Sequence, residues 1–587
     1  MKRSFFTVVS LLCLASIGRG QTAAPARVAA LLDEVKAIVA AQDGDLSAAI
    51  GQRDTAAAAT TQAVGERDTA RAATTQAVDE RDAQAVAIAS LTAALDAERS
   101  KPAATQPSFP GRLWHVSTAG NDAGAGTRGN PLRTISRAAL LASPGDRVIV
   151  RNGTYREAVL LSRGGTADRP IAFIAETPGA VVVDGSDPLT NWTRHAGPVF
   201  FTPWSADFVV GTQSDGTPKR FMGLPAPAGC AEQVFFNGQR LTQVAALADL
   251  GQATFFVDWT ADRLFVRLPG DVEPGTGLVE ASSRDRLFMS RLVGGKPSPA
   301  HHIWIDGFTF RRAANFPQRG AVTTNTGWRL SNIIVEQANA LGVGIAGDDV
   351  RLSDVIAQDN GQAGIGSGGS RNALLIRCTT RRNNYKGFSP GWEAGGGKIS
   401  NTDGLTVIGL TAADNIGQGL WLDSKNTNYS IRASTFSGNR GLTADWQGAG
   451  LFIEISDGPG RVDGCRFERN SGAAIEICES MGVTVTDCTL IDDHLKMRNM
   501  TGRGSYALRD ITVTGNRFAG LGIDIPSTII GPDGSQSRIA INGNTYDLAP
   551  GKALIAWAGK RYSTIESVRS ILKFEADGRV APIDRSN

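Results

Sequence analysis

Cysteine and histidine are scarce in this 587-residue chain, which holds 6 cysteines and 5 histidines. The cysteines are sparse and, once an N-terminal signal is removed, odd in number, which excludes a disulfide framework. The adjacent pair His301 and His302 has no further histidine at metal-ligand spacing, so we interpret both as structural. Neither sign of charge dominates, because 60 Lys and Arg against 57 Asp and Glu give a formal charge of +3. We expect no nucleic-acid partner, although an acidic polysaccharide stays compatible with this balance.

Long apolar runs are also missing after the N-terminus, so we expect no insertion into a membrane. Residues 1–20 place Lys2 and Arg3 ahead of a short apolar run followed by small residues, which indicates a cleavable export signal. Leu12 stands before Cys13, where a lipoprotein signal would carry a small residue, and this argues against a lipid anchor. The sequence therefore predicts a protein that is secreted, periplasmic or on the cell surface.

Proline is absent from residues 28–99, which are rich in Ala, Gln, Thr, Arg and Asp. Within them RDTAAAATTQAV recurs as RDTARAATTQAV, and Arg53, Arg67 and Arg81 are spaced by fourteen residues, or two heptads. Strong helix formers with this period predict a helical coiled-coil stalk, followed by a linker at residues 100–112. Such a stalk could form a homo-oligomer, and a soluble Ala-rich spacer is the alternative.

Glycine, in contrast, is abundant, with 68 residues. From residue 113 short β-branched runs alternate with Gly, Asn and Asp, and similar segments recur at intervals of about 22 to 32 residues. These segments are IDGFTF, SNIIVE, SDVIAQ, IRCTTR, IGLTAA, RASTFS, DGCRFE, TDCTLI, TGNRFA and NGNTYD. One turn per repeat with several short strands predicts an all-β parallel β-helix, a solenoid with its main coils at residues 301–548.

The ends of a solenoid need caps, and one region interrupts the repeat. We assign residues 113–190 to an N-terminal cap and first coils, because PLRTISRAALLA has helical spacing. Residues 191–300 contain hairpin patterns such as EQVFFNGQRLTQV and predict a small antiparallel β insertion. Residues 549–587 form the C-terminal cap segment, in which LIAWAGKRYSTIESVRSILKF has helical spacing.

The opening WHVSTAGNDAGAGTRGNPLRTISRA, with PGDRVIVRNGTYRE, resembles the start of pectate-lyase-like right-handed parallel β-helix proteins. VFFNGQRLTQV and the GWEAGGGK and GLWLD segments resemble a largely uncharacterised bacterial branch of that superfamily. The resemblance covers roughly residues 113–575 and implies a polysaccharide lying across the parallel strands. It does not fix the reaction, because this scaffold carries lyases, hydrolases, epimerases and adhesins. The DPHD tetrapeptide of alginate epimerases is absent.

Two acidic residues are predicted to lie side by side on the outer surface. In GLWLD the leucines have the inward phase, so Trp421 and Asp423 point outward. In GLFIE the same phase turns Glu454 outward, one coil from Asp423, at a spacing of about 4.8 Å. Two like charges this close need a metal, a nearby base or one protonated carboxyl to offset their repulsion.

The two longest coils flank this acidic pair, and loops of that kind wall a cleft. One carries Trp392, Glu393 and Lys398, and the other carries Trp446. The predicted catalytic residues are Asp423, Glu454, Glu393 and Lys398. The predicted substrate-binding residues are Trp392, Trp421, Trp446, Asn426 and Asp457.

Two mechanisms fit these residues. A retaining glycoside hydrolase, slightly preferred, would use two carboxyl groups about 5 to 5.5 Å apart. A polysaccharide lyase would bind Ca²⁺ with its acidic residues and abstract a proton with Lys398 or an arginine. No cofactor or metal ligand set is assigned otherwise. The alternative of a different class is a non-catalytic protein that binds polysaccharide or builds a cell-envelope layer.

Overall fold

The computed structural model describes residues 92–94, 96, 107–443, 445–500, 507–520, 527–531, 537–548 and 551–581, without the side chains of residues 445, 446, 528 and 537. The chain divides into units 1–85 and 86–587, and the account below concerns the second. The export signal and nearly all of the stalk lie outside the described residues, so both stay predictions. None of the described helices is long and apolar enough to cross a membrane.

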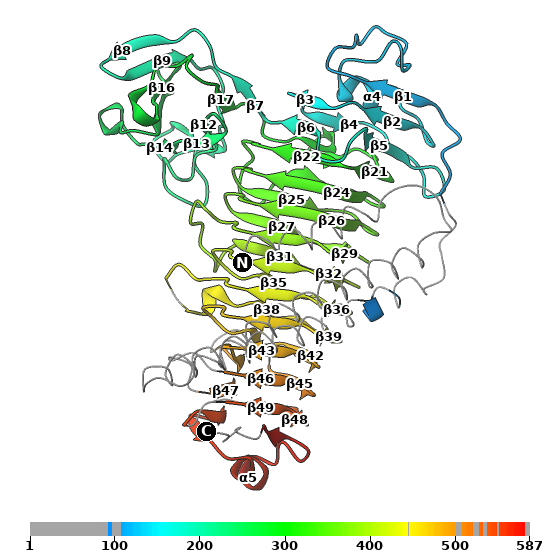
Figure 1. Cartoon of the computed structure of the whole chain (residues 1–587), viewed down its shortest axis with the longest axis vertical. Helices are drawn as coiled ribbons and strands as arrows, with labels where there is room; N and C mark the ends of the chain where they lie inside the picture. The colour runs from blue at the N-terminus through cyan, green and yellow to red at the C-terminus, as the bar shows by residue number, and fades with distance from the viewer. Residues whose placement is uncertain are drawn as a thin grey trace, which may run out of the picture. The chain divides into compact units, whose positions relative to one another are not determined.

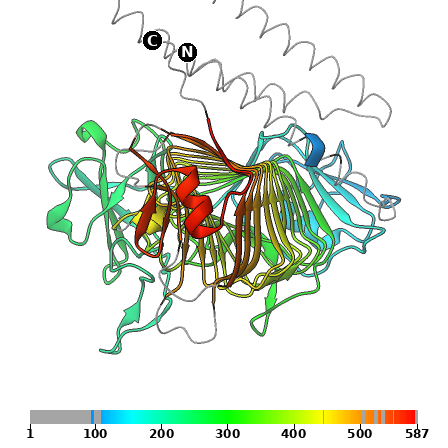
Figure 2. The same cartoon turned by 90° about the horizontal axis from the view of Figure 1, so that it is seen from below.

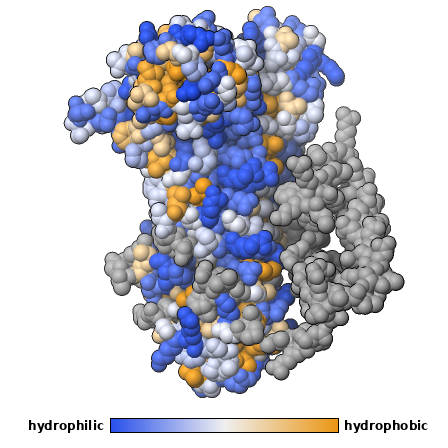
Figure 3. All heavy atoms as spheres, turned by 60° about the vertical axis from the view of Figure 1, so that its left-hand side comes forward, coloured by the Kyte–Doolittle hydropathy of each residue, from blue (hydrophilic) through white to orange (hydrophobic). Residues whose placement is uncertain are grey.

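Two long sheets of mostly parallel strands form a solenoid, which runs from the N-terminal cap to the C-terminal cap in Figure 1. Figure 2 shows the same solenoid from its C-terminal end, with the coils one behind another. Among the described residues, sheet A has 24 strands and sheet B has 13. Hydrophilic residues cover much of the described surface seen in Figure 3, because the apolar side chains of both sheets fill the interior. This architecture confirms the predicted all-β parallel β-helix.

Sheet A consists of β1 (Leu113–Val116), β2 (Arg147–Val150), β3 (Gly153–Tyr155), β5 (Ile171–Ala175), β6 (Val181–Asp184), β21 (Ile303–Asp306), β22 (Phe308–Arg311), β24 (Arg329–Glu336), β26 (Arg351–Gln358), β29 (Leu374–Ile376), β30 (Thr379–Arg381), β33 (Thr406–Ile408), β34 (Thr411–Ala413), β36 (Tyr429–Arg432), β37 (Thr435–Ser437), β39 (Gly460–Asp463), β40 (Arg466–Glu468), β42 (Met481–Thr486), β43 (Thr489–Ile491), β45 (Arg509–Thr514), β46 (Arg517–Ala519), β48 (Ser537–Asn542), β49 (Thr545–Asp547) and β52 (Arg579–Val580).

Sheet B consists, in spatial order, of β4 (Val159–Leu161), β18 (Phe288–Ser290), β23 (Gly320–Thr323), β25 (Leu341–Ile345), β27 (Ala363–Ser367), β31 (Gly395–Ser400), β35 (Leu420–Asp423), β38 (Leu451–Glu454), β41 (Ile475–Cys478), β44 (Leu495–Arg498), β47 (Ser527–Ile530), β50 (Ala553–Trp557) and β51 (Lys560–Tyr562). Two short strands, β28 (Ser370–Arg371) and β32 (Thr402–Asp403), pair beside it.

The ten repeated sequence segments each turn a corner of sheet A. Every one of them contains a residue with positive φ, such as Gly307 in IDGFTF and Asn332 in SNIIVE. Glycine, asparagine and aspartate tolerate this left-handed conformation better than other residues, which explains their recurrence at the corner. The positive-φ corner residues are Gly307, Asn332, Asp354, Arg377, Gly409, Ala433, Gly464, Asp487, Gly515 and Gly543.

The N-terminal cap contains the predicted helix, α4 (Ile135–Leu141). Its N-cap is Thr134, whose hydroxyl accepts a hydrogen bond from the Arg137 amide. Ile135 and Ala138 of this helix are buried in the main core, so α4 covers the open end of the solenoid.

The insertion forms a four-stranded sheet, a five-stranded sheet and the two-stranded pair β10–β11, with its own core, at the upper left of Figure 1. Its strands are β7 (Ser186–Pro188), β8 (Thr193–Ala196), β9 (Val199–Pro203), β10 (Gly211–Thr212), β11 (Pro218–Lys219), β12 (Val234–Phe236), β13 (Gln239–Arg240), β14 (Thr242–Gln243), β15 (Thr254–Asp258), β16 (Arg263–Arg267) and β17 (Val279–Ser282), with 3₁₀ turns η1 (Leu247–Asp249) and η2 (Pro269–Asp271). All pair antiparallel except β14 with β15. The predicted range 191–300 runs too far, because β18 already pairs in sheet B, followed by a hairpin of β19 (Leu292–Val293) and β20 (Lys296–Pro297).

The C-terminal cap is only half helical, which corrects the predicted helical spacing. Its first part is the antiparallel pair β50 and β51, and the helix begins later as α5 (Ile565–Ser567), continued by η4 (Val568–Leu572). The apolar residues before the turn at Gly559 fill the core from a strand instead of a helix. The free cysteines Cys378, Cys465 and Cys488 are buried in the same core, as expected for structural thiols.

A ladder of buried asparagines supports the turns between sheets. In each rung the side-chain amide donates to the side-chain oxygen of the next coil and to a backbone carbonyl. The rungs are Asn360, Asn383, Asn415, Asn439 and Asn470, and the ladder ends on Asp493. The repeated asparagines therefore satisfy backbone carbonyl groups at the turns.

The last rung gives the ladder a pH-dependent end. Burial raises the pKa of Asp493 to about 7 from 3.8. Between about pH 4 and pH 7 the folded protein therefore holds a proton that the unfolded chain has lost, so this group's contribution to stability falls as pH rises. We expect the gain in unfolding free energy of Asp493→Asn over the wild type to grow by a few kcal/mol across that window and to level off above it.

Urea unfolding of both proteins at several pH values measures this difference. The neighbouring His494, whose pKa is lowered to about 4 by burial, adds an opposite slope to both proteins, which cancels in the difference. A difference that does not change with pH would contradict the assignment.

Candidate functional site

Outward-facing positions of sheet B line up in rows across successive strands. One row joins Thr323, Gly344, Gly366 and Lys398 in register. Gly344 and Gly366 lack positive φ, and an added Cβ would meet no atom closer than 3.3 Å. The backbone conformation does not demand glycine there, although an added Cβ would press on the Thr323 hydroxyl or on the Leu341 methyl groups, and the missing side chains leave the surface hollow.

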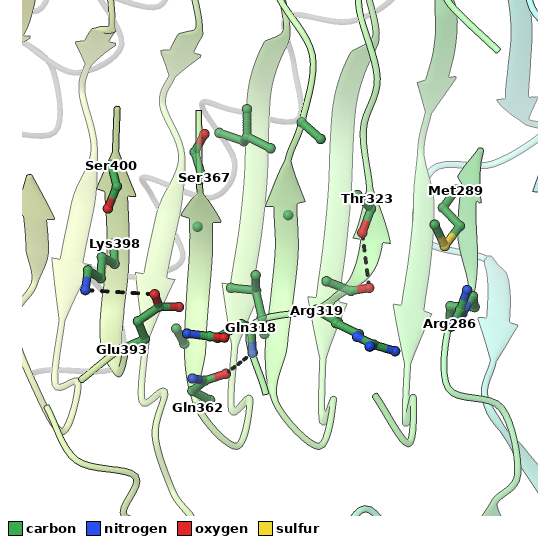
Figure 4. Close-up of a pocket in the computed structure, with 18 of the residues that line it drawn as sticks. Arg286, Met289, Gln318, Arg319, Thr323, Gln362, Ser367, Glu393, Lys398 and Ser400 are labelled. Carbon is green, nitrogen blue, oxygen red and sulfur yellow. Dashed lines mark hydrogen bonds and ion pairs between the residues drawn. The ribbon is translucent and has the colours of Figure 1, made fainter. Parts of the chain in front are cut away.

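A cleft of about 820 Å³ occupies this hollow. Its lining comes from the coils of β18 to β35, and Figure 4 shows the labelled side chains along it. In Figure 4 Arg286, Met289 and Arg319 lie toward one end, and Glu393 and Lys398 mark the other. Asp423 lines the same end from β35, the strand that pairs with the strand of Lys398. Gln318 and Gln362 border the middle, where the backbone N–H of Gln318 donates a hydrogen bond to the side-chain oxygen of Gln362 over 2.8 Å.

Lys398 joins two carboxylates at the end of the cleft. Its Nζ lies 2.9 Å from Asp423 Oδ2 and 3.9 Å from Glu393 Oε1. It also donates to the Trp392 carbonyl at 2.8 Å and lies 3.9 Å from the centre of the Trp421 ring. Three of the four predicted catalytic residues are therefore neighbours within one cleft.

The two acids have different surroundings. Burial raises the pKa of Glu393 above its usual value, and the charge of Asp423 adds to the rise, although Lys398 and a hydrogen bond with Gln318 oppose it. Asp423 instead holds the shorter ion pair with Lys398 and accepts a hydrogen bond from the Ser424 hydroxyl at 2.9 Å. Glu393 is thus biased toward its neutral form, whereas Asp423 is the acid that holds the closer contact with the Lys398 ammonium group.

Glu454 is the predicted catalytic residue that lies away from the cleft. Strand register pairs it with Asp423, as the aligned repeats predict. Its residue exposure is only 5 %, however, and it does not line the cleft. Burial lowers the pKa of Arg498, but the charge of its ion-pair partner Glu476 and, more weakly, that of Glu454 raise it, so Arg498 is a base that offsets both carboxylates.

Two predicted substrate-binding residues are corrected, because they are buried. Trp421 points out of the solenoid but is only 4 % exposed, and its ring stacks on Phe452 with centroids 5.4 Å apart. Asn426 is fully buried and donates to the Ile399 and Asp423 carbonyls at 3.1 Å. Neither can contact a glycan in this conformation. Residues from other segments cover the Trp421 ring, and the Asn426 side chain is engaged in hydrogen bonds to the backbone of a turn.

The other three predicted binding residues differ in position. Trp392 directly precedes Glu393 in the chain, and its half-buried ring lies beside Phe388. Asp457 is exposed but does not line the cleft. Trp446 belongs to the 3₁₀ turn η3 (Asp445–Gly448), and its side chain lies outside the described residues.

Sequence reasoning missed the half of the cleft that Arg286 and Arg319 mark. Arg319 is exposed there, and among the described residues it has no ion pair, whereas Arg286 pairs with Asp285 at 2.6 Å. The alternation of apolar residue and glycine in LGVGI and AGIGS was the available signal. Within the described part of the chain, no group of three or more His, Cys, Asp or Glu side chains is arranged to hold a metal.

Family comparison agrees with this fold. A family model described as a right handed beta helix region matches residues 319–490, and a model for a protein of unknown function, DUF1565, matches residues 118–160. Together with the two parallel sheets, this places the chain in the right-handed β-helix superfamily.

Individual relatives are distant. The uncharacterized protein YwoF of Bacillus subtilis strain 168 is 36 % identical over 75 residues, so the match spans 13 % of this chain and only 16 % of that protein. XylC, solved in complex with xylose, has a TM-score of 0.58 and 18 % identity over 76 % of this chain and 86 % of its own. The A-module of Azotobacter vinelandii mannuronan C-5 epimerase AlgE6 has a TM-score of 0.43 and 11 % identity over 74 % and 91 %.

Proposed function

We propose that the protein is a glycoside hydrolase that cleaves a polysaccharide at the Glu393, Lys398 and Asp423 end of the cleft. The observation that carries this proposal is the pair of carboxylates held on either side of one lysine within an open cleft. The xylose bound by XylC, which shares the fold, supports a sugar ligand. The export signal predicted at residues 1–20 would bring such an enzyme to extracellular glycans.

The two carboxylates suit the two roles of a hydrolase. Glu393, whose pKa is raised by burial, is the general acid that protonates the leaving oxygen. Asp423, ionised beside Lys398, is the nucleophile. Since Lys398 Nζ lies 2.9 Å and 3.9 Å from the two oxygens, Asp423 Oδ2 and Glu393 Oε1 are at most 6.8 Å apart. That limit favours the retaining mechanism, whose carboxyl groups stand about 5 to 5.5 Å apart.

The lyase alternative assigns proton abstraction to Lys398 or to an arginine, and the contacts of Lys398 bear on the first of these. A base needs a free lone pair facing the substrate. Lys398 Nζ instead donates to the Trp392 carbonyl and holds the ion pair with Asp423. These contacts favour hydrolysis, with Lys398 as the residue that positions both acids.

The test is a polysaccharide panel with the purified mature protein, with and without Ca²⁺. We expect new reducing ends without the ultraviolet absorbance of unsaturated uronates. Reducing ends with that absorbance would identify a lyase. A glycan retained on the protein without cleavage would identify a binding protein, and either result would overturn the proposal.

Replacing Lys398 tests the coupling of the two acids. In Lys398→Met the cation that lowers the Glu393 pKa is gone, so this pKa rises and the alkaline limb of kcat/KM moves to higher pH. Asp423 loses its ion pair and its fixed position at the same time, so we expect the rate to fall about 100-fold. Lys425→Met removes an exposed lysine on the neighbouring coil, which carries Asp423, and should leave the profile unchanged. If the pH profile of kcat/KM did not shift in Lys398→Met, Lys398 would have no influence on the two acids during the reaction.

A further inference from the structure

The cleft extends to one side only of the proposed catalytic residues. Its lining begins near Asp285 and ends at Asp423 and Ser424, which belong to the coil of β35. The coils of β23, β25, β27 and β31 lie between these two ends. Neighbouring strands are about 4.8 Å apart, so the open surface extends across several strand spacings before Asp423.

On the other side of Asp423 the outer face of sheet B is covered. The outward residues of the next two strands, Phe452 of β38 and Glu476 of β41, are 1 % and 0 % exposed. Together with Trp421, Phe452 forms an apolar cluster with Ala449 and Cys478, on which Met500 packs. In this outer cluster Trp421, Phe452 and Cys478 belong to β35, β38 and β41, whereas Ala449 comes from the end of the long coil before β38 and Met500 from the segment after β44.

A buried surface at this place limits how a glycan can bind. An enzyme that cuts within a chain must leave room for sugar residues on both sides of the scissile bond. Here the room on the far side of Asp423 ends at the outer cluster, whereas the near side is open. Resting on the proposed function, we infer that the enzyme acts at chain ends, with the terminal unit lodged at the closed end of the cleft beside Asp423 and the remaining chain lying along the open part.

A glycine in the lining of the cleft, Gly368, allows a second test of this arrangement. Gly368 lines the cleft on the coil of β27, two coils before Asp423, which is about 10 Å away. It lacks positive φ, and an added Cβ would meet no atom within 4 Å. In Gly368→Leu a side chain therefore obstructs the path of the remaining chain without disturbing the fold or the acids.

Product analysis is the primary test, carried out with the mature protein on whichever panel glycan it cleaves. We expect one short product from the first time points, a slow fall in viscosity, and no cleavage of oligosaccharides blocked at both ends. A ladder of oligosaccharides with a rapid fall in viscosity would overturn action at chain ends while leaving hydrolysis established. No cleavage of any panel glycan would instead overturn the proposed function, and the inference with it.

The Gly368→Leu variant locates the chain. We expect kcat/KM for the polymer to fall at least about 10-fold, against little change for an aryl glycoside that fills only the end of the cleft. Gly129→Leu is the matched control, because its added side chain also meets nothing within 4 Å and lies outside the cleft. If Gly368→Leu changed kcat/KM for the polymer no more than kcat/KM for the aryl glycoside, as Gly129→Leu should, the remaining chain would not lie over Gly368.

Discussion

Asp423→Asn is expected to lower kcat by about 10,000-fold or more while the protein stays folded, because losing a nucleophile costs at least this much in enzymes that form covalent intermediates. Asparagine keeps the shape of the side chain but cannot attack the anomeric carbon as a carboxylate does. The loss corresponds to roughly 5.5 kcal/mol of transition-state stabilisation at about 1.36 kcal/mol per tenfold. Initial rates on the cleaved glycan measure it.

Matched variants decide whether this loss is specific. Asp457→Asn removes an exposed acid on the next coil, outside the cleft, and should keep the rate within about twofold. Glu393→Gln should match the loss of Asp423→Asn on substrates with poor leaving groups, and the buried Glu454→Gln should lose much less. If Glu454→Gln lost as much as Asp423→Asn while Glu393→Gln stayed active, Glu454 would be the partner acid.

Asn439→Leu is expected to destabilise the protein by about 3 kcal/mol or more, because an interior rung of the ladder is lost. The Asn439 amide donates to the Ala412 carbonyl at 3.0 Å and to Asn470 Oδ1 at 2.9 Å. Its oxygen accepts from the Asn415 side chain at 2.9 Å. Leucine has a similar size but leaves these buried groups without their partner. Chemical denaturation measures the change in unfolding free energy.

A surface asparagine provides the control for this variant. Asn152 is exposed, and within the described part of the chain its side-chain amide contacts only the Thr177 hydroxyl, at 3.2 Å, so Asn152→Leu should change stability by less than about 0.5 kcal/mol. A similar small effect for Asn439→Leu would mean that the ladder contributes little net stability.

The solenoid could be predicted from the sequence because its signals are local and repeated. A residue with positive φ returns at the same corner of each coil, and the alternation of inward leucines fixed the neighbours of Asp423. Glu393 and Lys398 were within reach of prediction because a long coil carries both beside that strand.

The exposure of outward residues could not be predicted in the same way. Trp421 points out of the solenoid, as its phase predicts, yet Ala449 and Met500 from later segments cover it. Covering of this kind depends on how loops fold back, and a two-residue period does not record it. The open part of the cleft arises from absent side chains at Gly344 and Gly366, which in a sequence resemble the many turn glycines.

The most direct test of the central claim is mass spectrometry of the first products formed in water enriched in heavy oxygen. Hydrolysis at Asp423 and Glu393 predicts saturated products that carry one heavy oxygen atom at each new reducing end, and their loss in Asp423→Asn. Unsaturated products without the label, or labelled products formed equally by Asp423→Asn, would contradict the account.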